Sequence, residues 1–154
     1  FLIKRVVGVL QQEFSNLQQF ATLSPIPGFC RWLDAQPDAM SQQLHAQLTE
    51  PGWWKNVALS EQLEQDLSKK AAQYLVLARK GARAFDPVAH FHLSNGAEMA
   101  QINWLADCSE KGLKQSAGMM VNYRYQLADV EQNSQNYLDQ SEVRRSAAIS
   151  ALLE

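Results

Sequence analysis

Hydrophobic positions in two stretches of the chain recur at the spacing of one helical face. In residues 1–13 the apolar positions follow the i, i+4 and i+7 pattern, which predicts an amphipathic helix. Leucine and alanine keep similar spacing over residues 59–78, and we expect Ser60 to cap that helix. These are the strongest helical signals in the chain.

A short apolar segment, residues 20–23, leads into Ser24-Pro25-Ile26-Pro27-Gly28. Two prolines and a glycine end the element before them, because proline lacks an N–H and has a fixed φ. We therefore predict a buried strand that ends at Ser24, a rigid turn, and a short helix over residues 29–35. Short helices and loops are expected over the polar residues 36–52.

The strongest strand signal lies at residues 88–93 and 98–104, which flank Asn95-Gly96. This dipeptide is favoured in two-residue hairpin turns, so the pattern predicts a β-hairpin. Alternation would place His90, His92 and Asn103 together on its polar face. Helices are expected after residue 109, through Met119 to Val121, and at the C-terminus. The order of elements predicts a mixed α/β or α+β architecture. Because no segment has the composition of a linker, we expect residues 1–154 to belong to one domain.

Composition narrows the class of protein. Apolar residues make up 46% and charged residues 19%, which is typical of a globular chain. A net charge of −2 lacks the positive field that favours nucleic-acid binding, and no apolar run approaches the ~18 residues of a membrane span. We expect neither partner. Two cysteines, Cys30 and Cys108, give no sign of an oxidising compartment, so we predict free thiols and a cytoplasmic protein.

Candidate chemistry centres on a few polar residues. His90 and His92 could ligate a metal, but zinc commonly needs three or four ligands and the other His and Cys residues are scattered, so no metal site is predicted. His92 is then either a working histidine or a hydrogen-bonded core residue. Ser24 is either a rigidly aimed hydroxyl or only the start of a turn. Ser116 lacks the first glycine of a nucleophile elbow.

Five of the fourteen basic residues lie between positions 69 and 83. They form either a solvated face at a helix C-terminus or a docking patch for phosphates. Lys80 and Arg83 belong to this cluster.

Five segments, taken in order, resemble the malonyl-CoA decarboxylase family. They are FLIKRVV (1–7), LSPIPGF (23–29), DPVAHFHLSNGA (86–97), INWLAD (102–107) and GMMVNYRY (118–125). The resemblance implies an α/β (α+β) fold of the acetyltransferase-like GNAT type, a mixed sheet with surrounding helices. Residues 1–154 would be the C-terminal portion of that catalytic domain. The start at Phe1 leads us to expect an incomplete domain whose other active-site residues lie upstream.

The resemblance also implies a reaction and its residues. The family converts malonyl-CoA to acetyl-CoA and carbon dioxide with no metal or organic cofactor. By motif match, Ser24 and His92 form the catalytic pair and Tyr125 supports them. Candidate contacts to the acyl-CoA are Gly28, Lys80, Arg83 and Asn103. The family also implies a homo-oligomer, which Trp53-Trp54 and apolar helix faces favour.

Two other functions stay open. The chain could be an inactive fragment or an acyl-CoA-binding module of the same fold, which a carbon dioxide release assay would separate from a decarboxylase. It could also be a GNAT-type acyltransferase, which would transfer the acyl group to an added amine.

Overall fold

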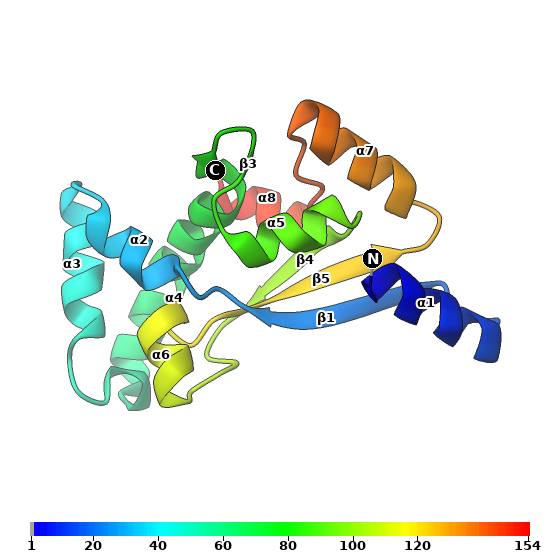
Figure 1. Ribbon diagram of the computed structural model, residues 1–154. Coiled ribbons are helices and arrows are strands. Elements are labelled where there is room, and N and C mark those ends of the chain that lie inside the picture. The colour runs from blue at the N-terminus through cyan, green and yellow to red at the C-terminus, as the bar shows by residue number, and fades with distance from the viewer. Residues whose placement is uncertain (1) are drawn as a thin grey trace.

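A small antiparallel sheet surrounded by helices forms the architecture of the protein in the computed structural model, which describes residues 2–154 (Figure 1). The α-helices are α1 (Leu2–Glu13), α2 (Phe29–Ala35), α3 (Ala39–Leu48), α4 (Val57–Ala72), α5 (Pro87–Ser94), α6 (Glu110–Ser116), α7 (Val130–Gln140) and α8 (Ala147–Leu152). The strands are β1 (Gln19–Pro25), β2 (Arg79–Lys80), β3 (Arg83–Ala84), β4 (Glu98–Asn103) and β5 (Met120–Gln126). Short helical turns η1 (Trp53–Lys55) and η2 (Gln73–Leu77) flank α4. The predicted mixed α/β class is confirmed.

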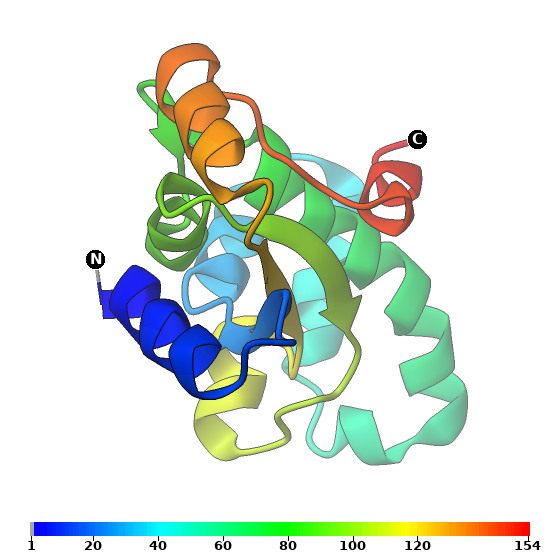
Figure 2. The same ribbon diagram turned by 90° about the vertical axis from the view of Figure 1, so that its right-hand side faces the viewer.

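The main sheet has the order β1-β5-β4, with both pairs antiparallel. Ser24 on β1 pairs with Val121 on β5, and the β4–β5 register shifts between Met99 and Gln101. Residues 144–146 extend the sheet in parallel, since Met99 accepts a hydrogen bond from the Ser146 amide (3.0 Å). In Figure 2, α1, α7 and α8 lie around the periphery of this sheet. β2 and β3 form a separate hairpin.

One face of the main sheet is covered and the other is open. Tyr123 and Tyr125 alternate along β5 and are at most 1% exposed, and Ser24 lies on the same face by register. On the opposite face Leu23 is 53% exposed. Burying apolar surface is the main stabilising term in folding, so the covered face is the core side of the sheet.

Aromatic side chains hold the helices that follow β1. The Tyr74 ring lies 6.0 Å from the ring of Phe29 and 5.3 Å from that of Trp32, both on α2. Trp53 is 3% exposed and packs between Trp54 and Trp104, so Trp53 is a core residue and not part of a self-association surface.

Several predicted elements are confirmed. β1 contains Ser24 and is followed by a turn and by α2 over residues 29–35, as predicted. The predicted burial of this strand is wrong: Ser24 is its one buried residue, and Leu23 is 53% exposed because one face of the sheet is open. α1 ends at Glu13, whereas its predicted start at Phe1 lies outside the described residues. The long central helix occurs as α4 followed by η2. Ser60 does not cap it: Asn56 Oδ1 accepts the Leu59 amide instead, and Ser60 Oγ accepts a hydrogen bond from Trp104.

The predicted hairpin at Asn95-Gly96 is wrong. Residues 87–94 form helix α5, in which Asp86 is the N-cap and Pro87 occupies the first turn. Proline suits that position because its missing N–H has no partner inside the helix anyway. Gly96 has φ +89°, and Ala97 N–H returns to His92 O (3.0 Å), so the dipeptide ends a helix. The second predicted strand is confirmed as β4.

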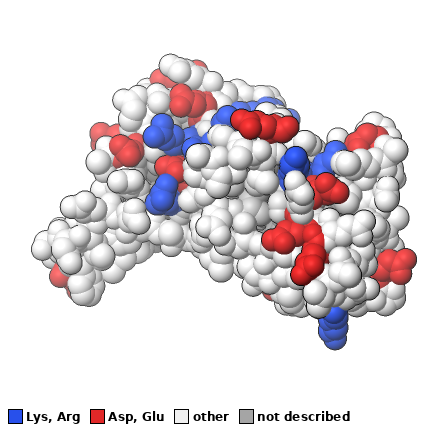
Figure 3. Space-filling view, turned by 180° about the vertical axis from the view of Figure 1, so that it is seen from behind, with Lys and Arg blue, Asp and Glu red and all other residues white. Residues whose placement is uncertain are grey.

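The predicted helix through Met119 to Val121 is also wrong, because this segment enters strand β5. Val121, Tyr123 and Tyr125 alternate on the buried face, a period of two that favours a strand over a helix. Within residues 2–154, no helix is long and apolar enough to cross a membrane. Acidic and basic side chains are interspersed over the face drawn in Figure 3.

Candidate active site

Ser24 is held at the end of β1 by the rigid turn that follows it. Its side chain points to the covered face of the sheet and is 6% exposed. In the turn, Ile26 is fully buried, and its amide donates to Ser116 Oγ (3.2 Å). Ser116 thus anchors the backbone that carries Ser24.

His92 reaches the same place from α5. Asp86 fixes the start of this helix, since its Oδ2 accepts the Ala89 amide (2.9 Å). The His92 ring stacks on the Tyr123 ring of β5 at 4.3 Å and an interplanar angle of 16°. A short, well-capped helix therefore lays the imidazole flat on the covered face of the sheet.

Three predicted catalytic residues form one hydrogen-bonded chain. His92 Nε2 lies 3.1 Å from Ser24 Oγ, and His92 Nδ1 lies 2.6 Å from the Tyr125 hydroxyl. All three side chains are buried and come from β1, α5 and β5. Because each imidazole nitrogen has one oxygen partner, the ring can pass a proton from one hydroxyl to the other.

Burial sets the charge state of this chain. It lowers the pKa of His92 to about 4, because desolvation penalises the imidazolium. It also raises the pKa of the Tyr125 hydroxyl. At neutral pH the imidazole and the phenol are therefore both uncharged, so that one ring nitrogen carries a proton and the other accepts one.

Thr22 and Tyr123 were not predicted as site residues. Thr22 Oγ1 lies 3.1 Å from Ser24 Oγ, and the buried Tyr123 supplies the ring under His92. Thr22 stands two residues before Ser24, and Tyr123 two before Tyr125. Strand alternation would have placed each of them on the face of its neighbour, but only after β5 had been recognised as a strand.

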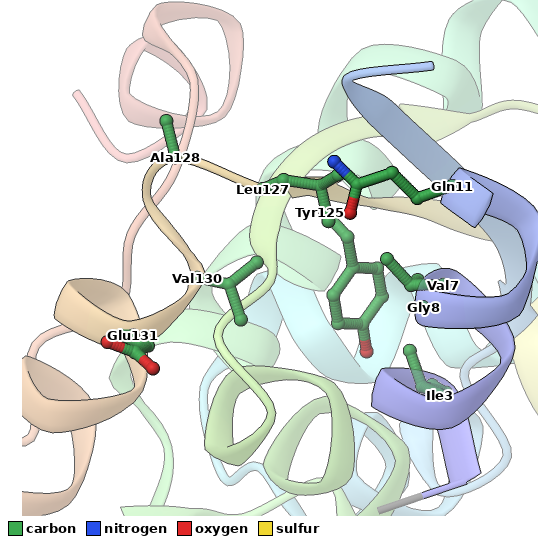
Figure 4. Close-up of a pocket in the computed structure, with 9 residues that line it drawn as sticks. All are labelled: Ile3, Val7, Gly8, Gln11, Tyr125, Leu127, Ala128, Val130 and Glu131. Carbon is green, nitrogen blue, oxygen red and sulfur yellow. The ribbon is translucent and has the colours of Figure 1, made fainter. Parts of the chain in front are cut away.

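A cavity of about 310 Å³ opens beside Tyr125. Its walls come from α1 and from the end of β5 through the start of α7, and they comprise Ile3, Val7, Gly8, Gln11, Tyr125, Leu127, Ala128, Val130 and Glu131. In Figure 4 the Tyr125 ring stands between Val130 on one side and α1 on the other. Tyr125 therefore joins the hydrogen-bonded chain to a hollow with both apolar and polar walls.

The four predicted acyl-CoA contacts occupy three separate places in the fold, since only Lys80 and Arg83 lie together. Gly28 is the N-cap of α2 and lies against the Tyr74 hydroxyl, while Lys80 and Arg83 face each other, both exposed, in the β2–β3 hairpin. Asn103 lies on the open face of the sheet, where its amide donates to Asn122 Oδ1 (2.8 Å). Their roles toward a ligand stay predictions.

Metal ligands do not gather in the part of the chain that the structure describes, since no group of three His, Cys, Asp or Glu side chains there could hold an ion. His90 lies on α5 with His92, but its Nδ1 is 2.8 Å from the Tyr137 hydroxyl. The two thiols are free, as predicted.

A helix-flanked sheet brings a serine, a histidine and a tyrosine into one buried hydrogen-bonded chain, a geometry suited to proton transfer. The chain belongs to the malonyl-CoA decarboxylase C-terminal domain family, whose sequence profile matches residues 1–154. Similar proteins named malonyl-CoA decarboxylase, mitochondrial, are those of Rattus norvegicus (38% identical, 99% of this chain) and Mus musculus (39%, 99%). This chain spans 36% of the length of each.

Solved structures agree with this assignment. The malonyl-CoA decarboxylase of Rhodopseudomonas palustris is similar with a TM-score of 0.91 and 36% identity, over 99% of this chain and 37% of that one. The enzyme of Agrobacterium vitis gives a TM-score of 0.90 and 38% identity, over 100% of this chain and 40% of that one. Both sequence and fold therefore support the family.

Proposed function

We propose that this chain takes part in the decarboxylation of malonyl-CoA to acetyl-CoA and carbon dioxide. Membership of the family supports the reaction. The observation that carries the proposal is the chain of contacts from Ser24 through His92 to Tyr125, at 3.1 and 2.6 Å. Decarboxylation needs a proton donor that is held in place and shielded from bulk water, and these contacts supply one.

The reaction breaks the bond between the carboxylate carbon and the α-carbon. Carbon dioxide leaves, and the electron pair stays on the α-carbon as an enolate of the thioester. The Ser24 O–H gives its proton to that carbon, while His92 Nε2–H restores the serine. His92 Nδ1 then takes the Tyr125 proton, and water in the adjoining cavity replaces it, so the overall reaction consumes one proton from solvent. After product leaves, proton exchange of the neutral ring with solvent moves its proton from Nδ1 back to Nε2 and restores the starting tautomer.

A neutral imidazole suits this relay. Because burial lowers the pKa of His92 to about 4, the ring carries a single proton at neutral pH. The 2.6 Å contact fits a phenol O–H donating to Nδ1, which leaves Nε2 as the protonated nitrogen facing Ser24. The serine hydroxyl hydrogen is then free to point at substrate.

The cavity beside Tyr125 is the proposed place for the thioester arm. Its apolar walls, among them Val7 and Val130, suit an alkyl chain, and Gln11 and Tyr125 offer polar groups. Lys80 and Arg83 remain the proposed contacts for the coenzyme A phosphates, since both are exposed cations on one hairpin.

Three further expectations belong to this proposal. No metal or organic cofactor is needed, so prolonged dialysis against a chelator should leave turnover unchanged. The protein forms a homo-oligomer, which the exposed Val6 (48%) and Val9 (57%) on α1 favour and light scattering would test. We also propose a cytoplasmic location. Cell fractionation tests it against the mitochondrial location in the names of the rodent relatives.

Carbon dioxide release from carboxyl-labelled malonyl-CoA tests the function, with the complete reading frame that contains this chain. We expect stoichiometric carbon dioxide and acetyl-CoA from that protein and release about 100-fold slower from its Ser24→Ala variant. Binding of malonyl-CoA without release would instead indicate an acyl-CoA-binding module. Acylation of an added amine would indicate an acyltransferase.

A further inference from the structure

We propose that Tyr74 is a positioning residue that sets the distance between Ser24 and His92 by tying the turn after β1 to the start of α5. The proposal rests on the proposed function for its kinetic consequence. Tyr74 belongs to η2 and is 1% exposed, and its hydroxyl donates to Asp86.

The Tyr74 hydroxyl lies between the two segments. It donates to Asp86 Oδ1 (3.1 Å), and Asp86 caps the helix that carries His92. On the other side, a Cβ built on Gly28 would stand 2.5 Å from the same hydroxyl oxygen. Gly28 closes the turn that begins at Ser24, so this oxygen is in close contact with both segments.

The Tyr74 ring repeats the same connection. It packs against Phe29 (6.0 Å) and Trp32 (5.3 Å) of α2, which begins immediately after Gly28. It also packs edge-on against Phe85 (5.9 Å), the residue before Asp86. The ring and its hydroxyl thus contact the approach to both catalytic residues.

Helix α5 is short, so a change at its cap reaches His92. The histidine lies six residues after Asp86, which is about 9 Å along a helix axis. The Ser24–His92 contact at 3.1 Å has little slack, because a displacement of about 1 Å takes the two atoms beyond hydrogen-bond reach. Such a displacement can reduce turnover by up to ~100-fold.

The first test is Tyr74→Phe, which keeps the ring and removes the hydroxyl. We expect kcat to fall about tenfold with KM within twofold, because substrate contacts are unchanged. We also expect the imidazole resonances of His92, followed by NMR, to shift. Unchanged kcat and unchanged resonances in a folded variant would overturn the proposal, and so would a fall in kcat with His92 unmoved.

The second test presses on the same contact from the other side. Gly28→Ala places a methyl group against the Tyr74 hydroxyl and should likewise lower kcat and move the His92 resonances. Adding Tyr74→Phe removes the clashing oxygen, so the double variant should be no worse than Tyr74→Phe alone. Multiplying losses would overturn the proposal. A rise in KM alone for Gly28→Ala would also overturn it, in favour of the predicted substrate contact.

Tyr137→Phe is the matched control. It also removes a buried tyrosine hydroxyl, one that accepts the Ala84 amide (2.8 Å) and bonds to His90 on the same helix. We expect its kcat within twofold of wild type, and an equal loss would show that any loosening of α5 suffices. If the wild-type protein releases no carbon dioxide, the proposed function fails, while the His92 resonances still decide whether Tyr74 positions the ring.

Discussion

Helix α5 carries two histidines in similar surroundings that have different partners. Both place Nδ1 against a tyrosine hydroxyl, His92 on Tyr125 at 2.6 Å and His90 on Tyr137 at 2.8 Å. Only His92 has Nε2 against a second hydroxyl, that of Ser24. A tyrosine partner is therefore common to both histidines, and the contact of Nε2 with Ser24 distinguishes the one that we propose as the proton relay.

The two rings also differ in their electrostatic surroundings. Burial alone lowers the pKa of His92, whereas the pKa of His90 is lowered by burial and then by the charge of Arg83. His90 additionally has Ser94 beside it, whose hydroxyl donates to the His90 carbonyl (2.6 Å). His92, on the covered face of the sheet, is thus isolated from charged groups, whereas His90 lies near the charge of Arg83.

The largest expected effect separates the two histidines directly. His92→Asn should lower turnover at least ~100-fold with modest loss of binding, because the serine loses its proton source. His90→Asn should change turnover by less than about threefold. Steady-state rates of both variants test this difference, and thermal denaturation confirms that both are folded. Comparable losses of turnover in the two variants would contradict the distinct role of His92.

Their tyrosine partners should differ in the same direction by less. Tyr125→Phe removes the hydroxyl at Nδ1 and should reduce kcat about tenfold. This is less than the ~100-fold or larger contribution of a full general acid, because water can replace part of the relay. Tyr137→Phe should cost stability, about 1 kcal/mol for a lost buried hydrogen bond, but little activity. We therefore expect a loss of kcat in Tyr125→Phe and a loss of thermal stability in Tyr137→Phe. A loss of thermal stability alone in both variants would indicate that Tyr125, like Tyr137, has only a structural role.

A filled cavity should raise KM and leave kcat nearly unchanged. Gly8 lines the cavity beside Tyr125, and a Cβ built there meets no atom within 4 Å. Gly8→Leu should raise the KM for malonyl-CoA about fivefold through the occupied space, and it should stabilise α1 because glycine is a poor helix former. An unchanged KM in the stable variant would move the thioester arm elsewhere.

A further expected effect is on the pH dependence of stability. Between about pH 6.5, the ordinary histidine pKa, and about pH 4, this histidine is protonated in the unfolded chain but neutral in the folded chain, where it is buried. His92 therefore contributes stability that is fully present above pH 6.5 and is lost as the pH falls toward 4. Denaturant titrations should show a shallower loss over this window in His92→Asn than in His90→Asn, and parallel curves would refute the assignment.

The motifs selected residues that the fold brings together, Ser24, His92 and Tyr125, but local pattern assigned the wrong element to His92. Ser24 was placed correctly because two prolines leave little choice of backbone. His92 was assigned to a strand because Asn95-Gly96 suits a hairpin, although the Asp86-Pro87 start also indicates a helix. A hairpin turn and a helix end at Asn95-Gly96 are distinguished by a tertiary contact. Gly96 faces the backbone of Val130, where a Cβ would stand 2.1 Å from its carbonyl oxygen.

The local sequence pattern could not predict contacts between segments that are distant in the chain. Nothing near Tyr74 indicates that its hydroxyl meets both Gly28 and Asp86, since the contact depends on how α2 and α5 pack. The register of β5 likewise required a partner strand, β1, that lies about a hundred residues earlier in the chain. The motifs supplied the residues, and the packing supplied their distances.

A double-mutant cycle on Ser24 and His92 tests the central claim most directly. Residues that act as one unit are strongly non-additive, because losing either one already disables the relay. We predict that Ser24→Ala and His92→Asn each lower kcat about 100-fold and that the double variant is no slower than either single variant. Losses that multiply, giving a double variant about 10,000-fold slower, would contradict a shared proton relay.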